Sequence, residues 1–286
     1  ALRVCQLKLK QHDVTRMRLV ATEACRRAAN AREFIRQVKR EAGLQLEIIE
    51  PEEEARLAVI SCAPLVSIKT EQLLVVDIGG GSTELVWIDL SSVPKRERPR
   101  AIMRLHAGFH PAESPFAAAK VVDWISVPLG VATLRDQFND VADDSARYAL
   151  MSWFFEENLA EFAPYRDEQP RDGFQIIGTS GTVTTVAASH LGLKRYDRTK
   201  VDGLRMTSDQ IDRVINSYLA LGPAGRQLDP RIGSDRQALI MSGSAILQAL
   251  LRCWPTKRLS VADRGLREGL LYAQMSRDGV LEDAPL

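Results

Sequence analysis

The chain has 286 residues, enough for two domains with a large hydrophobic core. Hydrophobic residues make up 45% and charged residues 26%, which is close to soluble globular proteins. The net charge of +1 argues against broad nucleic-acid binding, and no apolar run approaches the roughly 20 residues that span a bilayer.

Cysteines and histidines indicate no metal cluster and no covalent acyl chemistry. The four cysteines lie far apart, a spacing that suits neither a zinc site nor a dense disulfide frame: Cys5, Cys25, Cys62 and Cys253. We expect buried free thiols in a reducing cytoplasm. His106 and His110 are four residues apart, but Gly108 between them favours a loop.

The first fifty residues alternate between strands and helices. A strand is expected over residues 17–21. Asn30 and Glu33 form a capping-box pair that opens a helix, and Gly43 ends it. Residues 45–49 are expected to form the next strand.

Pro51 suits the first turn of a helix that runs to about residue 59. Three acids open this helix, and Glu54 points to a different side from Glu53. The alternative interpretation is a solvated helix start that the helix dipole favours.

An apolar strand over residues 74–78 carries Asp77 and then turns through glycines, and a second strand follows over residues 83–88. The turn offers N–H and hydroxyl donors for an anion from these residues: Gly79, Gly80, Gly81, Ser82 and Thr83. Asp77 and Glu84 supply hard oxygens suited to a divalent cation. The pattern lacks the lysine of a P-loop, and an acidic hairpin with a glycine-rich turn is the alternative.

The middle of the chain carries a charged turn and an apolar helix. Residues 95–100 are expected to form a solvated hairpin or linker, with a polyanion-binding patch as the alternative. Residues 145–162 place aromatic side chains at helical spacing, which indicates core packing.

A second apolar strand enters a glycine loop at residues 174–183, and a helix is expected from 182 to 191. A helix N-terminus after such a loop favours phosphate, with a plain strand-to-helix connection as the alternative. The phosphate-binding candidates are Gly178, Thr179, Ser180, Gly181 and Thr182.

The last hundred residues contain two further helices and a strand. A capped helix is expected over residues 207–221, with Gln210 in the capping-box position, and an Ala-rich helix over 242–251. A strand over 259–262 precedes Gly265 and a helix to about residue 275.

Four segments, in this order, resemble the exopolyphosphatase and guanosine pentaphosphate phosphohydrolase (Ppx/GppA) family. They are Glu53-Glu54-Ala55-Arg56-Leu57, Asp77-Ile78-Gly79-Gly80-Gly81-Ser82-Thr83-Glu84-Leu85, Gly178-Thr179-Ser180-Gly181-Thr182 and Asp263-Arg264-Gly265-Leu266-Arg267-Glu268-Gly269. The resemblance implies an α/β, actin-like, ribonuclease-H-like fold of two domains around a cleft. It places residues 1–63 in an incomplete first domain, 64–262 in the second, and 263–286 in a crossover helix that returns to the first.

The resemblance also implies Mg²⁺-dependent hydrolysis of a terminal phosphoanhydride in polyphosphate or guanosine pentaphosphate. The expected ligands are polyphosphate and guanosine penta- or tetraphosphate. Glu54 would be the general base, and Asp77 and Glu84 the metal ligands. Arg236 and Arg267 are basic candidates near the cleft; the alternative for Arg267 is a pair with Glu268 or a role at the helix start. A homodimer is kept as a hypothesis, and no nucleic-acid or membrane partner is expected.

Three departures from the family pattern qualify these expectations. Glu50-Pro51 stands where many members have Ser-Gly, and Arg236-Gln237-Ala238 stands where the family has Arg-Ala-Asp. The family's first Asp-centred glycine loop has no counterpart, so the chain is expected to begin inside the first domain and to be catalytically impaired. The alternatives are a non-catalytic module that binds polyphosphate or an alarmone, and an ATP-dependent kinase of the same superfold.

Overall fold

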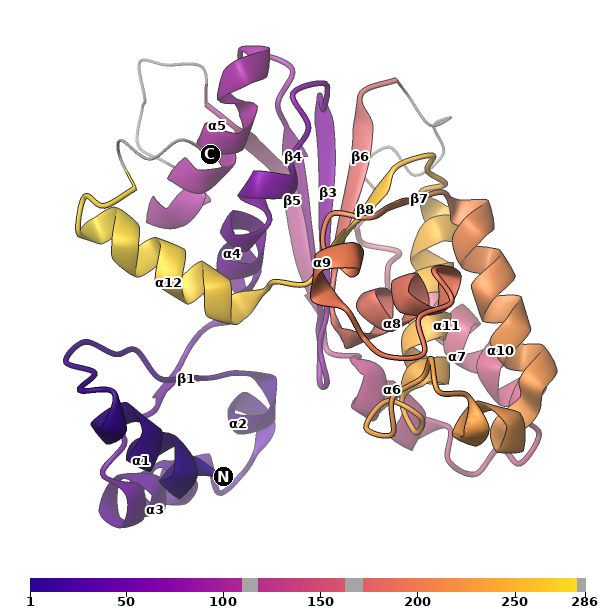
Figure 1. The fold of residues 1–286 in the computed structure, drawn as a ribbon, viewed down its shortest axis with the longest axis horizontal. Coiled ribbons are helices and arrows are strands. Elements are labelled where there is room, and N and C mark those ends of the chain that lie inside the picture. The colour runs from indigo at the N-terminus through magenta and orange to yellow at the C-terminus, as the bar shows by residue number, and fades with distance from the viewer. Residues whose placement is uncertain (110–117, 163–171, 282–286) are drawn as a thin grey trace. The chain divides into compact units, whose positions relative to one another are not determined.

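The computed structural model describes residues 1–109, 118–162 and 172–281 (Figure 1). The chain divides into two compact units, Ala1–Glu54 and Ala55–Leu286. The domain boundaries expected near residues 63 and 262 stay predictions. Each unit is described by itself below.

The first unit contains short strands and helices around a small core. Its elements are α1 (Leu2–Gln11), β1 (Val20–Ala21), α2 (Glu23–Arg27), α3 (Ala31–Ala42) and β2 (Glu47–Ile48). β1 and β2 pair in parallel over two residues only, so both predicted strands are shorter than expected. Gly43 ends α3 in the left-handed region (φ 63°), as predicted, but Asn30 makes no side-chain cap, so the capping box is wrong.

The second unit is built on a six-stranded mixed sheet of order β5-β4-β3-β6-β8-β7. The strands are β3 (Gln72–Ile78), β4 (Thr83–Asp89), β5 (Lys120–Val127), β6 (Phe174–Thr179), β7 (Arg205–Met206) and β8 (Leu259–Ala262). β3, β6 and β8 run parallel, so their carboxyl ends meet at one edge. β4, β5 and β7 pair antiparallel to their neighbours.

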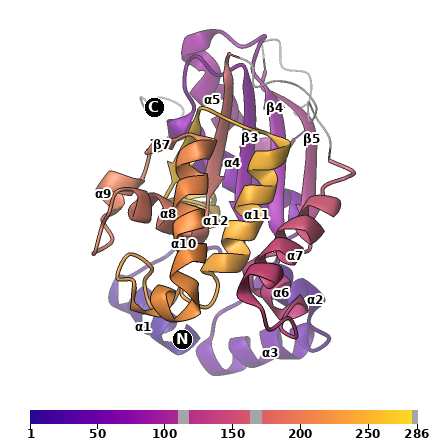
Figure 2. The same cartoon turned by 90° about the vertical axis from the view of Figure 1, so that its right-hand side faces the viewer.

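One face of this sheet packs on a large apolar core beneath helices that follow β5 in the chain (Figure 2). These helices are α6 (Val131–Gln137), α7 (Asp144–Glu157), α8 (Gly181–His190), α10 (Ser208–Leu228) and α11 (Ile240–Cys253). The short α9 (Arg198–Val201) follows α8. Leu74, Val76 and Ile78 of β3 point into this core, because alternate residues of a strand share one face.

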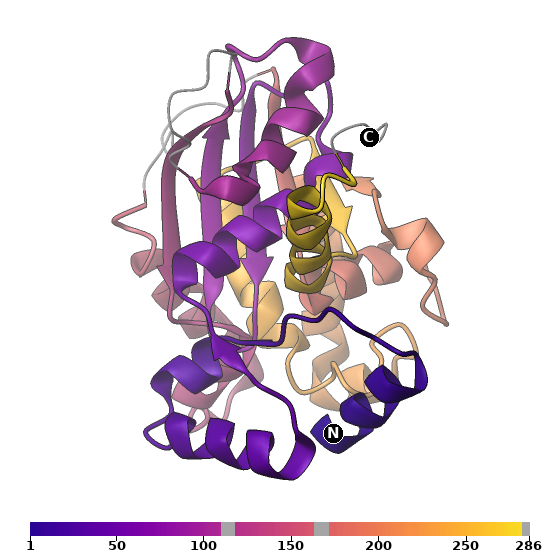
Figure 3. The same cartoon turned by 90° about the vertical axis from the view of Figure 1, so that its left-hand side faces the viewer.

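The opposite face carries α4 (Pro51–Ser61), α5 (Arg98–Arg104) and α12 (Leu266–Arg277) (Figure 3). The short 3-10 turns Ala63–Leu65, Lys95–Glu97 and Leu105–Ala107 flank α4 and α5. α12 approaches α4 closely, since a Cβ added at Gly269 would lie 2.0 Å from the carbonyl oxygen of Leu57. Only glycine fits at this crossing.

Several smaller predictions have clear outcomes. The capping box of Thr207 and Gln210 is formed at α10, whereas the charged stretch 95–100 is helical rather than a hairpin or linker. Arg98 in that stretch is buried and donates to the carbonyls of Val93 and Ile68. Among the described residues, no helix combines the length and apolar character that crossing a membrane requires.

The cysteine prediction is correct for half of the residues. Cys62 and Cys253 are buried free thiols, but Cys5 is exposed and Cys25 is half-buried. Cys5 lies on α1, which has no buried residue.

Candidate functional site

The first glycine loop, residues 79–82, joins β3 to β4 and contains three backbone amides that could bind an anion. The Gly79 N–H donates to the carbonyl of Ser82 at 2.9 Å and closes the turn. The amides of Gly80, Gly81 and Ser82 make no hydrogen bond within the described parts of the chain. Successive amides of this kind form an anion-binding concavity.

The carbonyls of the first glycine loop are fixed by the start of α6. Val131 N donates to Gly79 O and Ala132 N to Gly80 O, both at 2.9 Å. The Thr133 hydroxyl lies 3.2 Å from Gly81 O. A Cβ at Gly130 would lie 2.5 Å from Gly79 O, so the two backbones touch. The start of α6 therefore fixes the position of the first glycine loop through its carbonyl groups.

Thr83 takes a structural role instead of the expected hydroxyl contact with phosphate. Its side chain is fully buried, and its hydroxyl donates to Leu129 O at 2.8 Å. Thr83 pairs with Ile78, whose side chain points into the large core, which explains the burial.

A row of polar residues crosses the carboxyl edge of the sheet on the face of α4 and α12. Asp77 is the direct cross-strand partner of Glu84, and Glu84 pairs in turn with Ser126. On the other side Asp77 pairs with Thr179. Residues opposite each other on neighbouring strands share a face with Cβ atoms about 5 Å apart. Asp77 and Glu84 are therefore neighbours, as their predicted joint role requires.

The donor chemistry of the two acids fits a magnesium ion. Glu84 is 2% exposed, and its Oε1 accepts a hydrogen bond from the Ser126 hydroxyl at 2.8 Å, which orients the carboxylate. The described residues contain no group of three or more His, Cys, Asp or Glu that could enclose a metal. Mg²⁺ is commonly held by one or two carboxylates plus substrate phosphates, so a pair is sufficient.

The second glycine loop, residues 178–182, joins β6 to α8. Within the described residues, the amides of Gly181 and Thr182 make no hydrogen bond, as expected for the first positions of a helix. The Ser180 hydroxyl caps α8 by accepting from Val183 N at 3.1 Å. This loop thus offers a second set of donors with the positive end of a helix dipole.

Thr179, Ser180 and Thr182 contribute to the conformation of the second glycine loop. The Thr179 hydroxyl donates to Arg264 O. Thr182 is buried against α11, where a Cβ at Gly243 would lie 2.0 Å from its hydroxyl oxygen. Ser180 has φ 157° and ψ 168°, a region that non-glycine residues rarely adopt. Thr179 and Thr182 would therefore contribute backbone groups rather than hydroxyls to a ligand.

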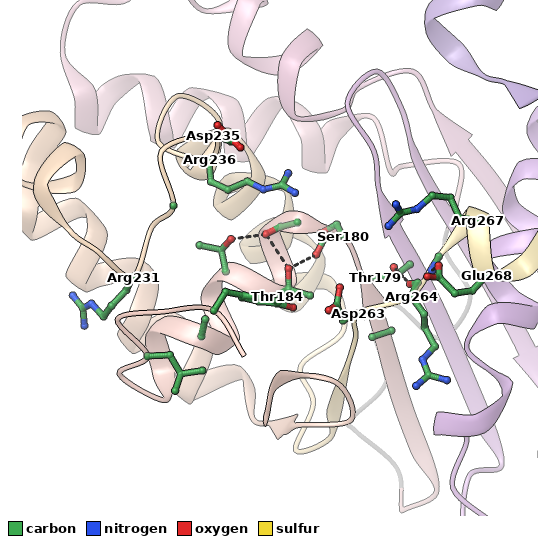
Figure 4. A pocket seen from close by; sticks show the side chains of 18 of the residues that line it. Thr179, Ser180, Thr184, Arg231, Asp235, Arg236, Asp263, Arg264, Arg267 and Glu268 are labelled. Atoms are coloured by element: carbon green, nitrogen blue, oxygen red, sulfur yellow. Dashed lines mark hydrogen bonds between the residues drawn. The ribbon is translucent and has the colours of Figure 1, made fainter. Parts of the chain in front are cut away.

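Arg236 and Arg267 converge on the second glycine loop (Figure 4). The guanidinium of Arg236 covers Gly181, because a Cβ there would lie 2.2 Å from the guanidinium carbon. Figure 4 shows Arg267, on the first turn of α12, pointing toward Arg236 above Ser180. Neither arginine forms an ion pair within residues 1–109, 118–162 and 172–281. Two cations therefore face the loop, and the part of the chain that the structure describes supplies no counter-ion for either.

The turn between β8 and α12 is tied to residues that the sequence did not indicate. Arg264 forms an ion pair with Asp202, which also accepts from Asp263 N at 3.0 Å. Glu268 accepts from Gly265 N at 2.9 Å and lies 3.7 Å from Arg198. Glu268 therefore caps α12 and has its own partner, so it does not pair with Arg267.

Glu54, in the first unit, is held by an arginine that the sequence did not single out. Its carboxylate accepts from Arg26 at 2.8 Å, and Arg26 also donates to Ile49 O and to Glu23. Although burial lowers the pKa of Arg26, its hydrogen bonds to Glu54 and Glu23 raise that pKa above the ordinary value. Glu54 is 9% exposed and Arg26 is half-buried, and their ion pair limits the orientations of the carboxylate.

Burial also governs the thiol next to the polar row. Desolvation raises the pKa of Cys62 to about 12, and the charge of Asp77 acts in the same direction. Cys62 therefore remains a neutral thiol and is no candidate nucleophile.

Sequence reasoning missed the residues that support the two loops. Gly130 and Thr133 lie about fifty residues from the loop they hold, and only the fold brings them together. Ser126 is on β5, a strand that was not predicted, and Arg26 is on a helix of five residues. The one available signal was Gly130, which precedes an apolar stretch as a helix N-cap can.

Comparison with known proteins places these features in a family context. A sequence model of the Ppx/GppA phosphatase family matches residues 1–278. Guanosine-5'-triphosphate,3'-diphosphate pyrophosphatase of Aeromonas hydrophila is 25% identical over 277 residues, which are 97% of this chain and 48% of that protein. The chain thus spans about half the length of the curated relatives it matches.

Solved structures agree with the family match. The crystal structure of the Aquifex aeolicus Ppx/GppA family member has a TM-score of 0.71 and 31% identity, covering 97% of this chain and 79% of that one. An exopolyphosphatase from Cytophaga hutchinsonii has a TM-score of 0.76 at 22% identity, covering 98% and 80%, and supports the fold alone. The expected actin-like α/β fold is confirmed.

Proposed function

The chain belongs to the Ppx/GppA phosphatase family, and on this basis we propose that the full-length protein hydrolyses terminal phosphoanhydrides. The substrate would be inorganic polyphosphate or guanosine pentaphosphate, and the product orthophosphate. The observation that carries the proposal is the second glycine loop: unbonded amides at the start of α8 lie beneath two arginines with no ion pair among the described residues. This arrangement suits a terminal phosphate.

The backbone would hold most of the phosphate oxygens. The amides of residues 80–82 and 181–182 lie in loops that hydrogen bonds from the starts of α6 and α8 hold in place. Arg236 and Arg267 would neutralise the charge that is spread over the equatorial oxygens in a loose transition state.

Asp77 and Glu84 would hold Mg²⁺, which when bound supplies charge neutralisation at phosphate oxygens. The Ser126 hydroxyl keeps the Glu84 carboxylate in place. Thr179, next to Asp77 in the row, donates its hydroxyl to Arg264 O and so links the acid pair to the turn that carries Arg267.

Glu54 would act as the general base and take the proton from the attacking water. A base must be ionised and fixed within hydrogen-bonding distance of its proton donor. The ion pair with Arg26 limits the rotation of the carboxylate. Arg26 would therefore be a positioning residue for Glu54.

The test is orthophosphate release from polyphosphate, guanosine pentaphosphate and ATP, each measured with and without Mg²⁺. In the full-length protein, Glu54→Gln should leave folding intact, because the amide oxygen can still accept from Arg26 and Arg26 keeps its pair with Glu23. It should remove most of the release, because the amide cannot accept the proton. Glu52→Gln is the matched control, since Glu52 is an exposed carboxylate in the same first turn of α4.

Near-wild-type turnover of Glu54→Gln would rule out Glu54 as the base. Tight polyphosphate binding with no release would indicate a binding module. Transfer of phosphate from ATP to a sugar or acetate, but not to water, would indicate a kinase.

A further inference from the structure

A cavity of about 500 Å³ lies beside the second glycine loop, within the second unit (Figure 4). Its walls come from the loop and α8, from residues 230–236, and from the turn between β8 and α12. Arg267 lines this cavity from the first turn of α12, so its position depends on how the preceding turn, residues 263–265, is held. Asp202, which does not line the cavity, makes the central contacts with that turn.

The Asp202 carboxylate binds two successive residues of the turn. Its Oδ1 accepts from Asp263 N at 3.0 Å and lies 3.3 Å from Arg264 Nε, and its Oδ2 accepts from Arg264 Nη2. The pair with Arg264 is therefore bidentate, which fixes the direction of the guanidinium as well as its distance. The side chains of Arg264 and Asp202 are only 18% and 17% exposed, so water screens their attraction less than it screens a surface pair.

Asp202 is itself fixed to the sheet. Gly203 N donates to Val261 O, and Val261 N donates to Leu204 O, both at 2.8 Å. Gly203 has φ 81°, in the left-handed region that favours glycine, and this conformation turns the chain from α9 toward β7. The Asp202 carboxylate is thus anchored to β8, two residues before the turn that it holds.

Two further hydrogen bonds hold the same turn through its carbonyl groups. The Thr179 hydroxyl of the second glycine loop donates to Arg264 O. Arg198, on α9, donates to Asp263 O at 2.6 Å. The turn is therefore tied both to the second glycine loop and to the segment that carries Asp202.

Figure 4 shows the side chains of Arg264 and Arg267 on opposite sides of the turn. Arg264 contacts Asp202, while Arg267 faces the second glycine loop. We propose that Asp202, through its pair with Arg264, is a positioning residue that holds Arg267 for the terminal phosphate. The inference rests on the proposed function for the contact between Arg267 and phosphate. Anchorage of the turn would raise affinity, because an ordered arginine loses less entropy on binding than a mobile one.

Charge alone predicts the opposite effect of removing Asp202. A carboxylate near an anion site repels the ligand, so its removal should tighten binding. Positioning predicts weaker binding instead, because the turn loses the acceptor for Asp263 N and the partner of Arg264. The sign of the change therefore separates the two explanations.

The test is a double-mutant cycle, measured by calorimetric titration of tripolyphosphate. Asp202→Ala should weaken binding by about three- to tenfold, within the coupling range of residues that share one hydrogen-bond network. Arg267→Ala should weaken binding by at least about tenfold. Adding Asp202→Ala to Arg267→Ala should change the affinity by less than about twofold, because no arginine is then left to position.

Glu156→Ala is the matched control. It also removes a carboxylate that lies 2.8 Å from an arginine, Arg252, and neither residue lines the cavity, so binding should be unchanged. Urea unfolding of each variant checks that it is folded. If Asp202→Ala does not fold, Asp202→Asn takes its place in the cycle; it keeps an acceptor oxygen and should weaken binding by about two- to fivefold.

Unchanged or tighter binding in the Asp202 variant would overturn the inference. An equal loss with and without the Arg267 side chain would also overturn it, because that result indicates a general effect on the site. If Arg267→Ala weakens binding in either case, the proposed phosphate contact stands without the positioning role. If Arg267→Ala binds as wild type does, the phosphate contact fails and the positioning role fails with it.

Discussion

Replacing Gly130 with alanine should displace the first glycine loop and weaken phosphate binding. The new Cβ would lie 2.5 Å from Gly79 O and 2.5 Å from the carbonyl carbon of Gly80, and both contacts are with backbone. Gly130 has φ −108° and ψ −175°, which alanine adopts readily, so the whole effect would come from this clash.

The magnitude follows from the contacts that must separate. Overpacking in a well-packed site costs about 1–3 kcal/mol. Separation would also stretch the bonds from Val131 N to Gly79 O and from Ala132 N to Gly80 O, each worth about 0.5–1.5 kcal/mol. Alanine also lowers the entropy of the unfolded chain, which raises the free energy of unfolding by about 0.4–1 kcal/mol. A net loss of about 1–5 kcal/mol should lower Tm by roughly 2–4 °C per kcal/mol.

The assay is urea unfolding combined with calorimetric titration of tripolyphosphate. Gly80→Ala is the control for stability, because a Cβ at Gly80 meets nothing within 4 Å and Gly80 is not among the positive-φ glycines. If Gly130→Ala and Gly80→Ala have equal unfolding free energies, and Gly130→Ala binds tripolyphosphate as wild type does, the close approach does not hold the loop.

Three further predictions concern local energetics, each measured by urea unfolding. Ser180→Gly should stabilise the protein by about 1 kcal/mol. Relief of about 1–3 kcal/mol of backbone strain outweighs the few tenths of a kcal/mol lost with the helix cap and the entropy cost of glycine. A loss of stability would contradict the presence of strain at Ser180. Asp144→Ala should lower the free energy of unfolding by about 3 kcal/mol, because it leaves the guanidinium of Arg226, which is 5% exposed, without its carboxylate partner. The double variant Asp144→Ala with Arg226→Leu should recover much of that loss. The hydrogen bonds from Arg231 hold the pKa of Asp229 in the folded protein below its ordinary value of about 3.9. The ionised Asp229 therefore contributes to folding stability above about pH 3.9, and this contribution is lost as the pH falls through the pKa of Asp229 in the folded state. Asp229→Asn should therefore flatten the acid limb of the stability profile below about pH 4, and an unchanged limb would contradict the pairing.

The sequence predicted the parts of the site that are contiguous in the chain. Both glycine loops follow apolar strands as expected, and β8 has the predicted bounds of residues 259–262. These predictions succeeded because glycine runs and buried strands leave a strong local pattern. The Thr207 and Gln210 capping box succeeded for the same reason.

Predictions failed where tertiary contacts decide the outcome. Residues 95–100 looked like a solvated turn because of their charge. In the structure Arg98 is buried, and its guanidinium donates hydrogen bonds to the carbonyls of Val93 and Ile68. Thr83 was expected to offer its hydroxyl to phosphate, yet strand alternation buries its side chain and the hydroxyl donates to Leu129 O. The row that joins Asp77 to Ser126 depends on the register of three strands, which no local pattern specifies.

The central claim is that Arg236 and Arg267 bind the terminal phosphates of the substrate at the second glycine loop. It is tested most directly by calorimetric titration of tripolyphosphate into Arg236→Ala and Arg267→Ala. Arg195→Ala is the control for net charge, because Arg195 is an exposed cation that does not line the cavity. We expect each site variant to bind at least about tenfold more weakly, consistent with loss of a charge-assisted hydrogen bond, and Arg195→Ala to bind as wild type does. Unchanged affinity in both site variants would contradict the account.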